Sequence, residues 1–140
     1  MKSFFLLTSL AACALAQRMH IQAPTPGQTV SGNGTVTVEL EQDPSLGPMR
    51  QTSVLIAIAS CYDVCDQPDQ WSPGTIVYNG GFDPEWNTSA PEKGHYQDFQ
   101  VQLPGLQPGP IVFQVAHQYQ VGGAELQPVF DYATVLVNVV

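Results

Sequence analysis

Apolar and polar residues alternate along several short segments of the chain, and helical periodicity is almost absent. In the segment from Thr35 to Gln42, Val36, Val38 and Leu40 share one face, while Thr and Glu residues occupy the other. Turn-forming Pro, Gly and Asn residues separate these segments. The pattern is typical of strands with one face in a core and the other in water.

Seven strands follow from this pattern. They are expected at His20 to Ala23, Thr35 to Gln42, Thr52 to Cys61, Thr75 to Tyr78, Tyr96 to Leu103, Ile111 to Gln120 and Ala133 to Val140. Pro24 and Pro26 stop the first strand and predict that it lies at a sheet edge. The apolar run VLIAIA in the third indicates a central strand. We therefore predict an all-β fold, an immunoglobulin-like or fibronectin-III-like β-sandwich without the Cys-Trp-Cys framework of true immunoglobulin domains.

The first sixteen residues predict export. Lys2 precedes a short apolar run that begins at Phe4 and ends in small residues at Ala14-Leu15-Ala16, the pattern of a cleavable secretory signal peptide. The run is too short to span a bilayer, and no later stretch approaches about 18 apolar residues. We expect residues 1–16 to be removed and residues 17–140 to form a single secreted domain without membrane insertion.

Cleavage would also change the cysteine count, because Cys13 would leave with the signal peptide. Cys61 and Cys65 would remain, an even pair that predicts one disulfide in an oxidising compartment. Closing a loop of about five residues constrains the unfolded chain by only about 2 kcal/mol, so the bridge would shape a loop more than hold the fold. A redox or metal role for the pair is the alternative.

The expected secreted chain is strongly acidic. Its basic residues are Arg18, Arg50 and Lys93, against twelve Asp and Glu residues, which gives a formal charge of −9. Nucleic acid and anionic membranes are therefore poor partners. The acidic residues are spread through loops, and solubility explains most of them.

Few residues point to catalysis. The sequence has no G-x-S-x-G elbow, no H-E-x-x-H helix and no phosphate-binding glycine loop. His20, His95 and His117 lack metal-ligand spacing, although strands could bring the last two together. His117 is expected to be a hydrogen-bonded core histidine. A copper enzyme would need His20 at the mature N-terminus, which requires cleavage after Met19, where the small-residue pattern is missing. We expect no enzyme, no cofactor and no metal.

Loop residues offer binding chemistry instead. Trp71, Phe82 and Trp86 flank the fourth expected strand, and exposed aromatic side chains stack on sugars or anchor protein contacts. The alternative is that they fold back as a lid over the sandwich end. Two N-glycosylation sequons begin at Asn33 and Asn87. A glycan on Asn87 would partly shield Trp86.

Six short segments point to a known family. They are Thr75 to Gly80 (TIVYNG), His95 to Phe99 (HYQDF), Gly109-Pro110, Val115 to His117 (VAH), Gly122 to Ala124 (GGA) and the ending Val135 to Val139. In order and spacing they resemble the necrosis-inducing secreted protein family of fungal cell-death effectors. The resemblance runs from about Ile21 to Val140 and includes no catalytic signature.

The resemblance implies a small secreted β-sandwich that provokes plant cell death and dampens pattern-triggered immunity. The implied partners are host immune kinases, both receptor-associated co-receptor kinases and receptor-like cytoplasmic kinases, met in the host apoplast or the host cell cytoplasm. An inhibitor of this kind needs a few desolvated aromatic anchors and no active site.

The contact region is expected between Gln118 and Tyr132, where not every apolar side chain can reach the core. The candidate contacts are Tyr119, Leu126, Phe130 and Tyr132, with Trp86 as a further candidate. The alternative is that Phe130 and Tyr132 seal the sandwich end. We expect a monomer. The alternative function is an extracellular carbohydrate-binding or cell-wall-associated module that stacks sugars on Trp71 and Trp86.

Overall fold

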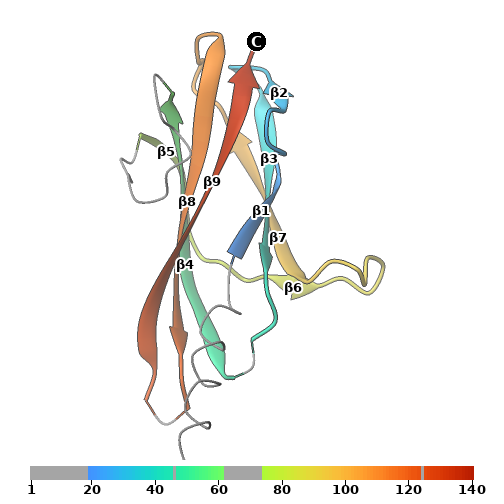
Figure 1. The fold of residues 1–140 in the computed structure, drawn as a ribbon, viewed down its shortest axis with the longest axis vertical. Coiled ribbons are helices and arrows are strands. Elements are labelled where there is room, and N and C mark those ends of the chain that lie inside the picture. Colours follow the sequence, from blue (N-terminus) through green and yellow to red (C-terminus); the bar gives the residue numbers. More distant parts are fainter. Residues whose placement is uncertain (1–18, 46, 62–73, 124) are drawn as a thin grey trace, which may run out of the picture.

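The computed structural model describes residues 19–45, 47–61, 74–123 and 125–140, and these residues form nine β-strands and no helix (Figure 1). The strands are β1 (Met19–Ala23), β2 (Thr29–Val30), β3 (Thr35–Gln42), β4 (Met49–Ser60), β5 (Thr75–Gly80), β6 (Glu85–Trp86), β7 (His95–Gln102), β8 (Gly109–Val121) and β9 (Gln127–Val139). The expected signal peptide, Cys65 and Trp71 lie outside the described residues. No helix in the described part is long and apolar enough to cross a membrane.

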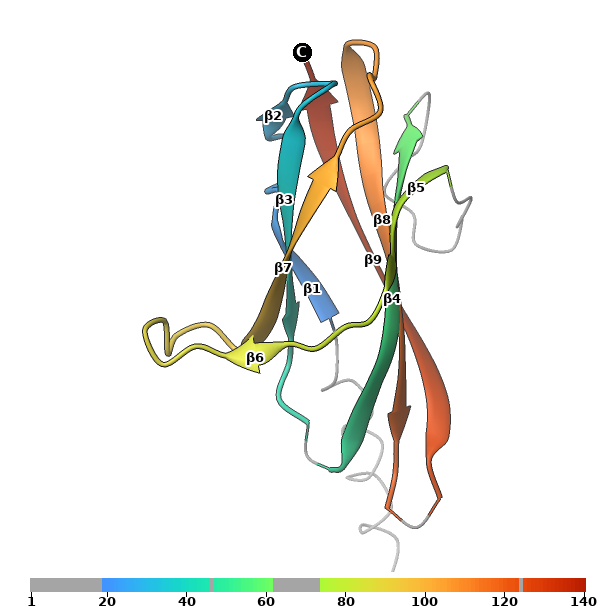
Figure 2. The ribbon, with the colours of Figure 1, turned by 180° about the vertical axis from the view of Figure 1, so that it is seen from behind.

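The strands form two sheets that face each other. The four-stranded sheet has the order β1-β3-β7-β6, and the five-stranded sheet has the order β2-β9-β8-β4-β5. Neighbouring strands are antiparallel except β2 and β9, which pair in parallel over two residues. Figures 1 and 2 show that β4, β8 and β9 extend well past the four-stranded sheet at the end that holds the β8–β9 turn.

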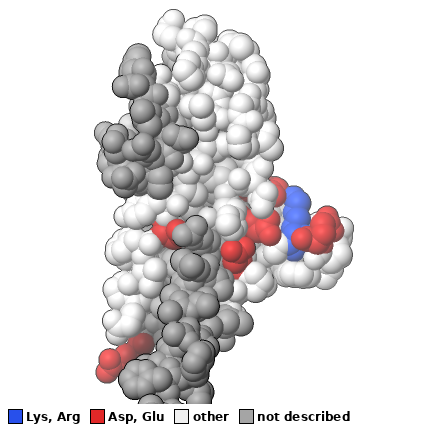
Figure 3. Space-filling view, in the orientation of Figure 1, with Lys and Arg blue, Asp and Glu red and all other residues white. Residues whose placement is uncertain are grey.

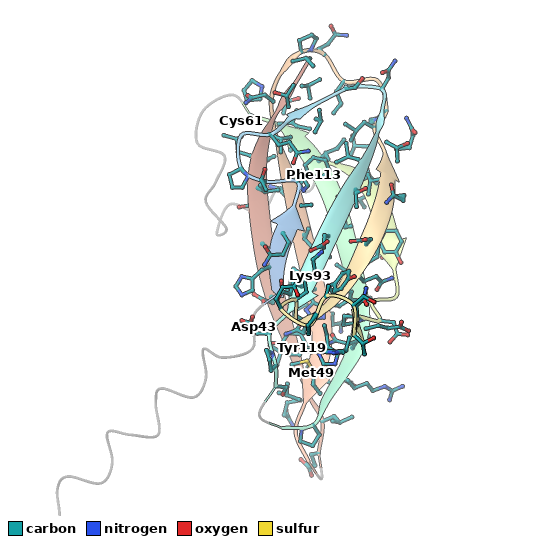
Figure 4. All side chains as sticks on the ribbon, turned by 90° about the vertical axis from the view of Figure 1, so that its right-hand side faces the viewer. Asp43, Met49, Cys61, Lys93, Phe113 and Tyr119 are labelled. Atoms are coloured by element: carbon teal, nitrogen blue, oxygen red, sulfur yellow. The ribbon has the colours of Figure 1, made fainter. Side chains whose placement is uncertain are left out.

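The core lies between the sheets and follows the predicted alternation. Val36, Val38 and Leu40 of β3 are buried, while β8 buries every residue from Ile111 to Val115 and then alternates, with His117 and Tyr119 buried. Phe113, which is fully buried, lies between the sheets (Figure 4). Each large apolar side chain buried in this way stabilises the fold by about 1.5–3 kcal/mol. The all-β prediction with two sheets is confirmed.

The structure corrects the predicted number of strands. Each of the seven expected segments contains a strand, but β2 and β6 add two more of two residues each. Strands this short produce no alternation in the sequence. The prediction also began the last strand at Ala133, whereas β9 begins at Gln127. The segment taken for a hairpin connection is therefore largely strand.

The predicted places of two strands are confirmed. β1 lies at the edge of the four-stranded sheet, and β4 lies between β8 and β5. Beyond the end of β4, the Cys61 N–H donates to the Pro110 carbonyl oxygen at 3.0 Å. Cys61 is disulfide-bonded. Its expected partner Cys65 is outside the described residues, so the pairing stays a prediction.

The carboxylate of Asp131 joins the two sheets where β1 passes β9. Its Oδ2 accepts a hydrogen bond from the Met19 N–H at 2.8 Å, and its Oδ1 accepts one from the Tyr132 N–H at 2.9 Å. The Tyr132 N–H therefore has a partner within the chain, and Pro128 has no N–H to offer. Both features reduce the tendency of this strand edge to pair with another chain.

Candidate binding surfaces

The face of the five-stranded sheet that points away from the core carries large apolar side chains. Partners in an antiparallel ladder project from the same face, and Val135, Val137 and Val139 of β9 are buried inside. The alternate residues of β9 and their partners therefore point outward. Their rows are Phe130–Gln118–Ser53, Tyr132–Ala116–Leu55, Thr134–Gln114–Ala57–Ile76 and Leu136–Val112–Ala59. We call these four rows the outer apolar face.

Four large side chains of the outer apolar face are accessible. Phe130 is 58 % exposed, Ile76 52 %, Tyr132 44 % and Leu136 38 %. No charged residue occurs in the four rows, although the expected secreted chain is strongly acidic. An uncharged apolar area on a monomer surface is a feature of protein-binding sites.

The contact residues predicted from the sequence do not all lie on one exposed surface. Phe130 and Tyr132 do not seal the sandwich end, because both point outward and are exposed. Leu126, at the β8–β9 turn, is also exposed. Tyr119 is only 4 % exposed and its ring stacks on His117 at 4.8 Å, so it offers little surface to a partner. Trp86 lies on the other sheet.

His117 is buried in a cluster of aromatic side chains. Its Nε2 is 2.6 Å from Oε1 of Gln51, and the Phe82 ring meets it edge-on at 4.9 Å. Burial lowers the pKa of His117 to about 4, while Asp131 on the paired strand opposes this shift. The expectation of a hydrogen-bonded core histidine is confirmed. Phe82, which is buried, is the lid residue that the sequence offered as an alternative.

His95 and His117 do not come together. His95 begins β7 and makes an edge contact with Trp86, with ring centroids 5.7 Å apart. Over the described ranges, no group of three His, Cys, Asp or Glu side chains is arranged to hold a metal ion.

Trp86 borders a groove of about 590 Å³ on the four-stranded sheet. Trp86 is 49 % exposed. Tyr96 and Gln97 of β7 and three carboxylates, those of Asp83, Glu85 and Asp98, line the groove with it. Trp86 was predicted from the sequence as a binding residue, but Tyr96, Gln97 and the three carboxylates were not. The signal that could have found them is the solvent-facing alternation of Tyr96 and Asp98 next to a loop that holds Trp86.

Hydrogen bonds fix the walls of the groove. The Asp83 N–H donates to Oε1 of Gln97 at 2.7 Å. Nδ2 of Asn87 donates to the Tyr96 hydroxyl at 2.9 Å, and Oδ1 of Asn87 accepts from the Ser89 N–H at 2.8 Å. These bonds order the base of the loop around the groove.

The segment 87–94 projects from the molecule as an arm that is anchored at its base (Figures 1 and 2). Nζ of Lys93 pairs with Oε2 of Glu39 at 2.7 Å and lies 4.6 Å from the centre of the Tyr96 ring. The hydrogen bond to Glu39 raises the pKa of Lys93. The Gly94 N–H donates to Oε1 of Glu41 at 3.0 Å. Figure 3 shows acidic residues gathered around a basic residue at the arm, and Figure 4 shows Lys93 at the base of the arm.

Both sequon asparagines are exposed, as glycosylation requires. Asn33 lies in the turn before β3, where Oγ of Ser31 donates to its Oδ1 at 2.9 Å. Asn87 lines the Trp86 groove itself. Whether either asparagine carries a glycan stays a prediction.

Comparisons with known proteins identify no family for the chain. Neither a scan against protein-family models nor a search of curated proteins finds a match for the chain.

Proposed function

We propose that the chain is an exported, non-enzymatic effector that acts by binding protein. In line with the family resemblance of its sequence, it induces plant cell death and suppresses pattern-triggered immunity by inhibiting co-receptor kinases and receptor-like cytoplasmic kinases. The observation that carries the binding role is the outer apolar face, on which Phe130 and Tyr132 are exposed side by side in alternate positions of β9. The kinase partner comes from the resemblance.

The chemistry of the outer apolar face supports binding without catalysis. Aromatic anchors dominate interface energies when a partner covers them completely. The side chains of Gln118 and Thr134 lie in the same rows as Phe130, Gln114 and Ile76 and provide hydrogen-bonding groups among the apolar ones. A standard interface covers about 800 Å² per partner, an area that a sheet face of strands with 12 and 13 residues can provide.

The strand order supports an immunoglobulin-like classification. In the immunoglobulin fold, strands A, B, E and D form one sheet and strands C, F and G the other, with C′ added beside C in variable domains. The order β1-β3-β7-β6 corresponds to A-B-E-D, and β9-β8-β4-β5 corresponds to G-F-C-C′. On this assignment, the outer apolar face is the exposed face of the C, F and G strands.

The direct test is a kinase assay. Purified residues 17–140 are titrated into the isolated kinase domain of a plant co-receptor kinase, and phosphate transfer is measured with binding. We expect inhibition that saturates at equimolar ratio in the micromolar range or below. The absence of both binding and inhibition at micromolar concentration would contradict the proposal.

The place of action is tested in leaves. The chain is expressed transiently with and without residues 1–16, and necrosis and the oxidative burst are scored. Suppression of the burst by the form without residues 1–16 would indicate action inside the host cell. Activity that requires residues 1–16 would indicate action in the apoplast, and the absence of both responses in either form would contradict an effector role.

A second candidate function, binding of carbohydrate, is favoured by one observation. Trp86 is half exposed beside a groove lined with carboxylates, amides and a phenol. A polysaccharide pull-down with Trp86→Ala as the control tests it. Retention that does not depend on Trp86 would argue against this function.

A further inference from the structure

The carboxylates of the Trp86 groove give it a negative charge, which restricts the kinds of sugar that can bind there. We propose that it binds an oligosaccharide whose rings carry protonated amino groups, such as an oligomer of glucosamine. This inference rests on the second candidate function, carbohydrate binding, and is independent of the kinase proposal, because the groove and the outer apolar face belong to different sheets.

Trp86 supplies the platform for a sugar ring. The residue is 49 % exposed, and the edge contact with His95 at 5.7 Å limits the orientations of the indole. The face of an indole is electron-rich, so it attracts both the C–H groups of a sugar ring and a nearby ammonium group. Trp is the side chain that gives the strongest cation–π interaction.

Three carboxylates determine the preferred charge of the ligand. Asp83, Glu85 and Asp98 line the groove. The ion pairs found among the described residues are Lys93–Glu39 and His20–Asp43, so none of the three carboxylates forms an ion pair there, although Asp98 is close enough to Lys93 to help raise the pKa of that lysine. A neutral sugar would leave the charges of Asp83 and Glu85 unbalanced, and an acidic sugar would be repelled. A protonated amino sugar complements these charges.

The groove is held in shape before any ligand arrives. The hydrogen bonds from Asp83 to Gln97 and from Asn87 to Tyr96 link the walls to β7. The arm itself is closed by two turns, in which Ala90 N–H donates to the Asn87 carbonyl and Lys93 N–H to the Ala90 carbonyl, each at 3.0 Å. A site fixed in this way loses less conformational freedom on binding.

The protein for the test must lack a glycan beside the groove. Asn87 lines the groove and also begins a sequon, which ends at Ser89. Ser89→Ala removes the sequon and keeps the Asn87 side chain, and its backbone N–H can still donate to Asn87. This variant is therefore the reference protein, and the other substitutions are made in it.

The experiment is a calorimetric titration at a pH at which the amino groups are protonated. The ligands are a glucosamine oligomer, the N-acetylated oligomer of the same length and a neutral glucose oligomer. We expect the glucosamine oligomer to bind at least tenfold more tightly than the other two, and added salt to weaken it. Trp86→Ala should reduce its affinity at least tenfold, and Asp98→Asn should reduce the preference over the acetylated oligomer.

Two control variants show whether binding depends on the Trp86 groove, and the choice of ligand distinguishes a wrong sugar class from the absence of carbohydrate binding. Phe130→Ala, on the other sheet, should leave sugar binding unchanged, and Trp86→Phe should restore part of the affinity that Trp86→Ala loses. Equal binding of the amino and acetylated oligomers would overturn the amino-sugar inference and leave carbohydrate binding in place. Binding of none of the three, or glucosamine binding that ignores Trp86→Ala, would overturn both.

Discussion

At the scale of single residues, His117 couples the stability of the fold to pH. Burial lowers its pKa to about 4 in the folded chain, against about 6.5 in an unfolded chain. Between these pH values the unfolded chain binds more protons, so the free energy of unfolding rises with pH. We predict that stability falls as pH drops from about 6.5 to about 4, by up to about 3 kcal/mol from this group.

The measurement is urea unfolding at pH 7, 5.5 and 4 for the wild-type chain and for His117→Gln. Gln does not titrate but can still pair with Gln51, which now contacts Nε2 of the ring. The carboxylates titrate in both proteins, so the difference in slope isolates His117. Equal pH slopes for the two proteins would contradict this prediction.

At the scale of elements, the β8–β9 hairpin depends on one glycine in its turn. Gly122 has φ of +131°, and a methyl group on its Cα would collide with the Glu125 carbonyl oxygen. Gly123, the next residue, has open space around it. We predict that Gly122→Ala lowers the free energy of unfolding by about 1–3 kcal/mol, whereas Gly123→Ala changes it by less than about 0.5 kcal/mol. Equilibrium denaturation of the two variants checks this, and equal costs would disprove it.

Substitutions in the same hairpin should separate effects on partner binding from effects on stability. Phe130 and Tyr132 point into solvent, so their replacement by Ala should change stability by less than about 0.5 kcal/mol each. If they anchor a kinase, the double variant should bind at least tenfold more weakly. Tyr119→Ala, by contrast, removes a buried ring and should cost about 3–5 kcal/mol. Calorimetry and thermal unfolding measure both effects, and a double variant with wild-type affinity would count against the outer apolar face.

The strands differ in how well the sequence pattern predicted them. β3 and β7 were predictable because one face of each is apolar and the other polar. For β9 the sequence predicted a strand only from Ala133 and did not show which face enters the core, because both faces carry apolar residues: Phe130, Tyr132 and Leu136 alternate with Val135 and Val137. Only pairing with β8 decides which set enters the core. For the same reason, the sequence alone could not choose between Phe130 as a contact and Phe130 as a core residue.

At the scale of the whole molecule, the two sheets differ in surface chemistry. Most described acidic residues belong to the four-stranded sheet and the segments around it, where Figure 3 shows them beside the arm. The outer apolar face of the other sheet has none. The sequence predicted the excess of acid but not its distribution, because residues such as Glu39, Asp83 and Asp98 meet only through strand pairing and loop packing.

Binding through the outer apolar face is tested by transfer of magnetisation from an unlabelled co-receptor kinase domain to leucine methyl groups of the labelled chain in the complex. If the kinase covers the outer apolar face, intensity should be lost at Leu55 and Leu136, which lie in that face, and not at the buried Leu40 and Leu103. A kinase complex in which Leu55 and Leu136 are unaffected, or in which only the arm residues 87–94 change, would contradict it.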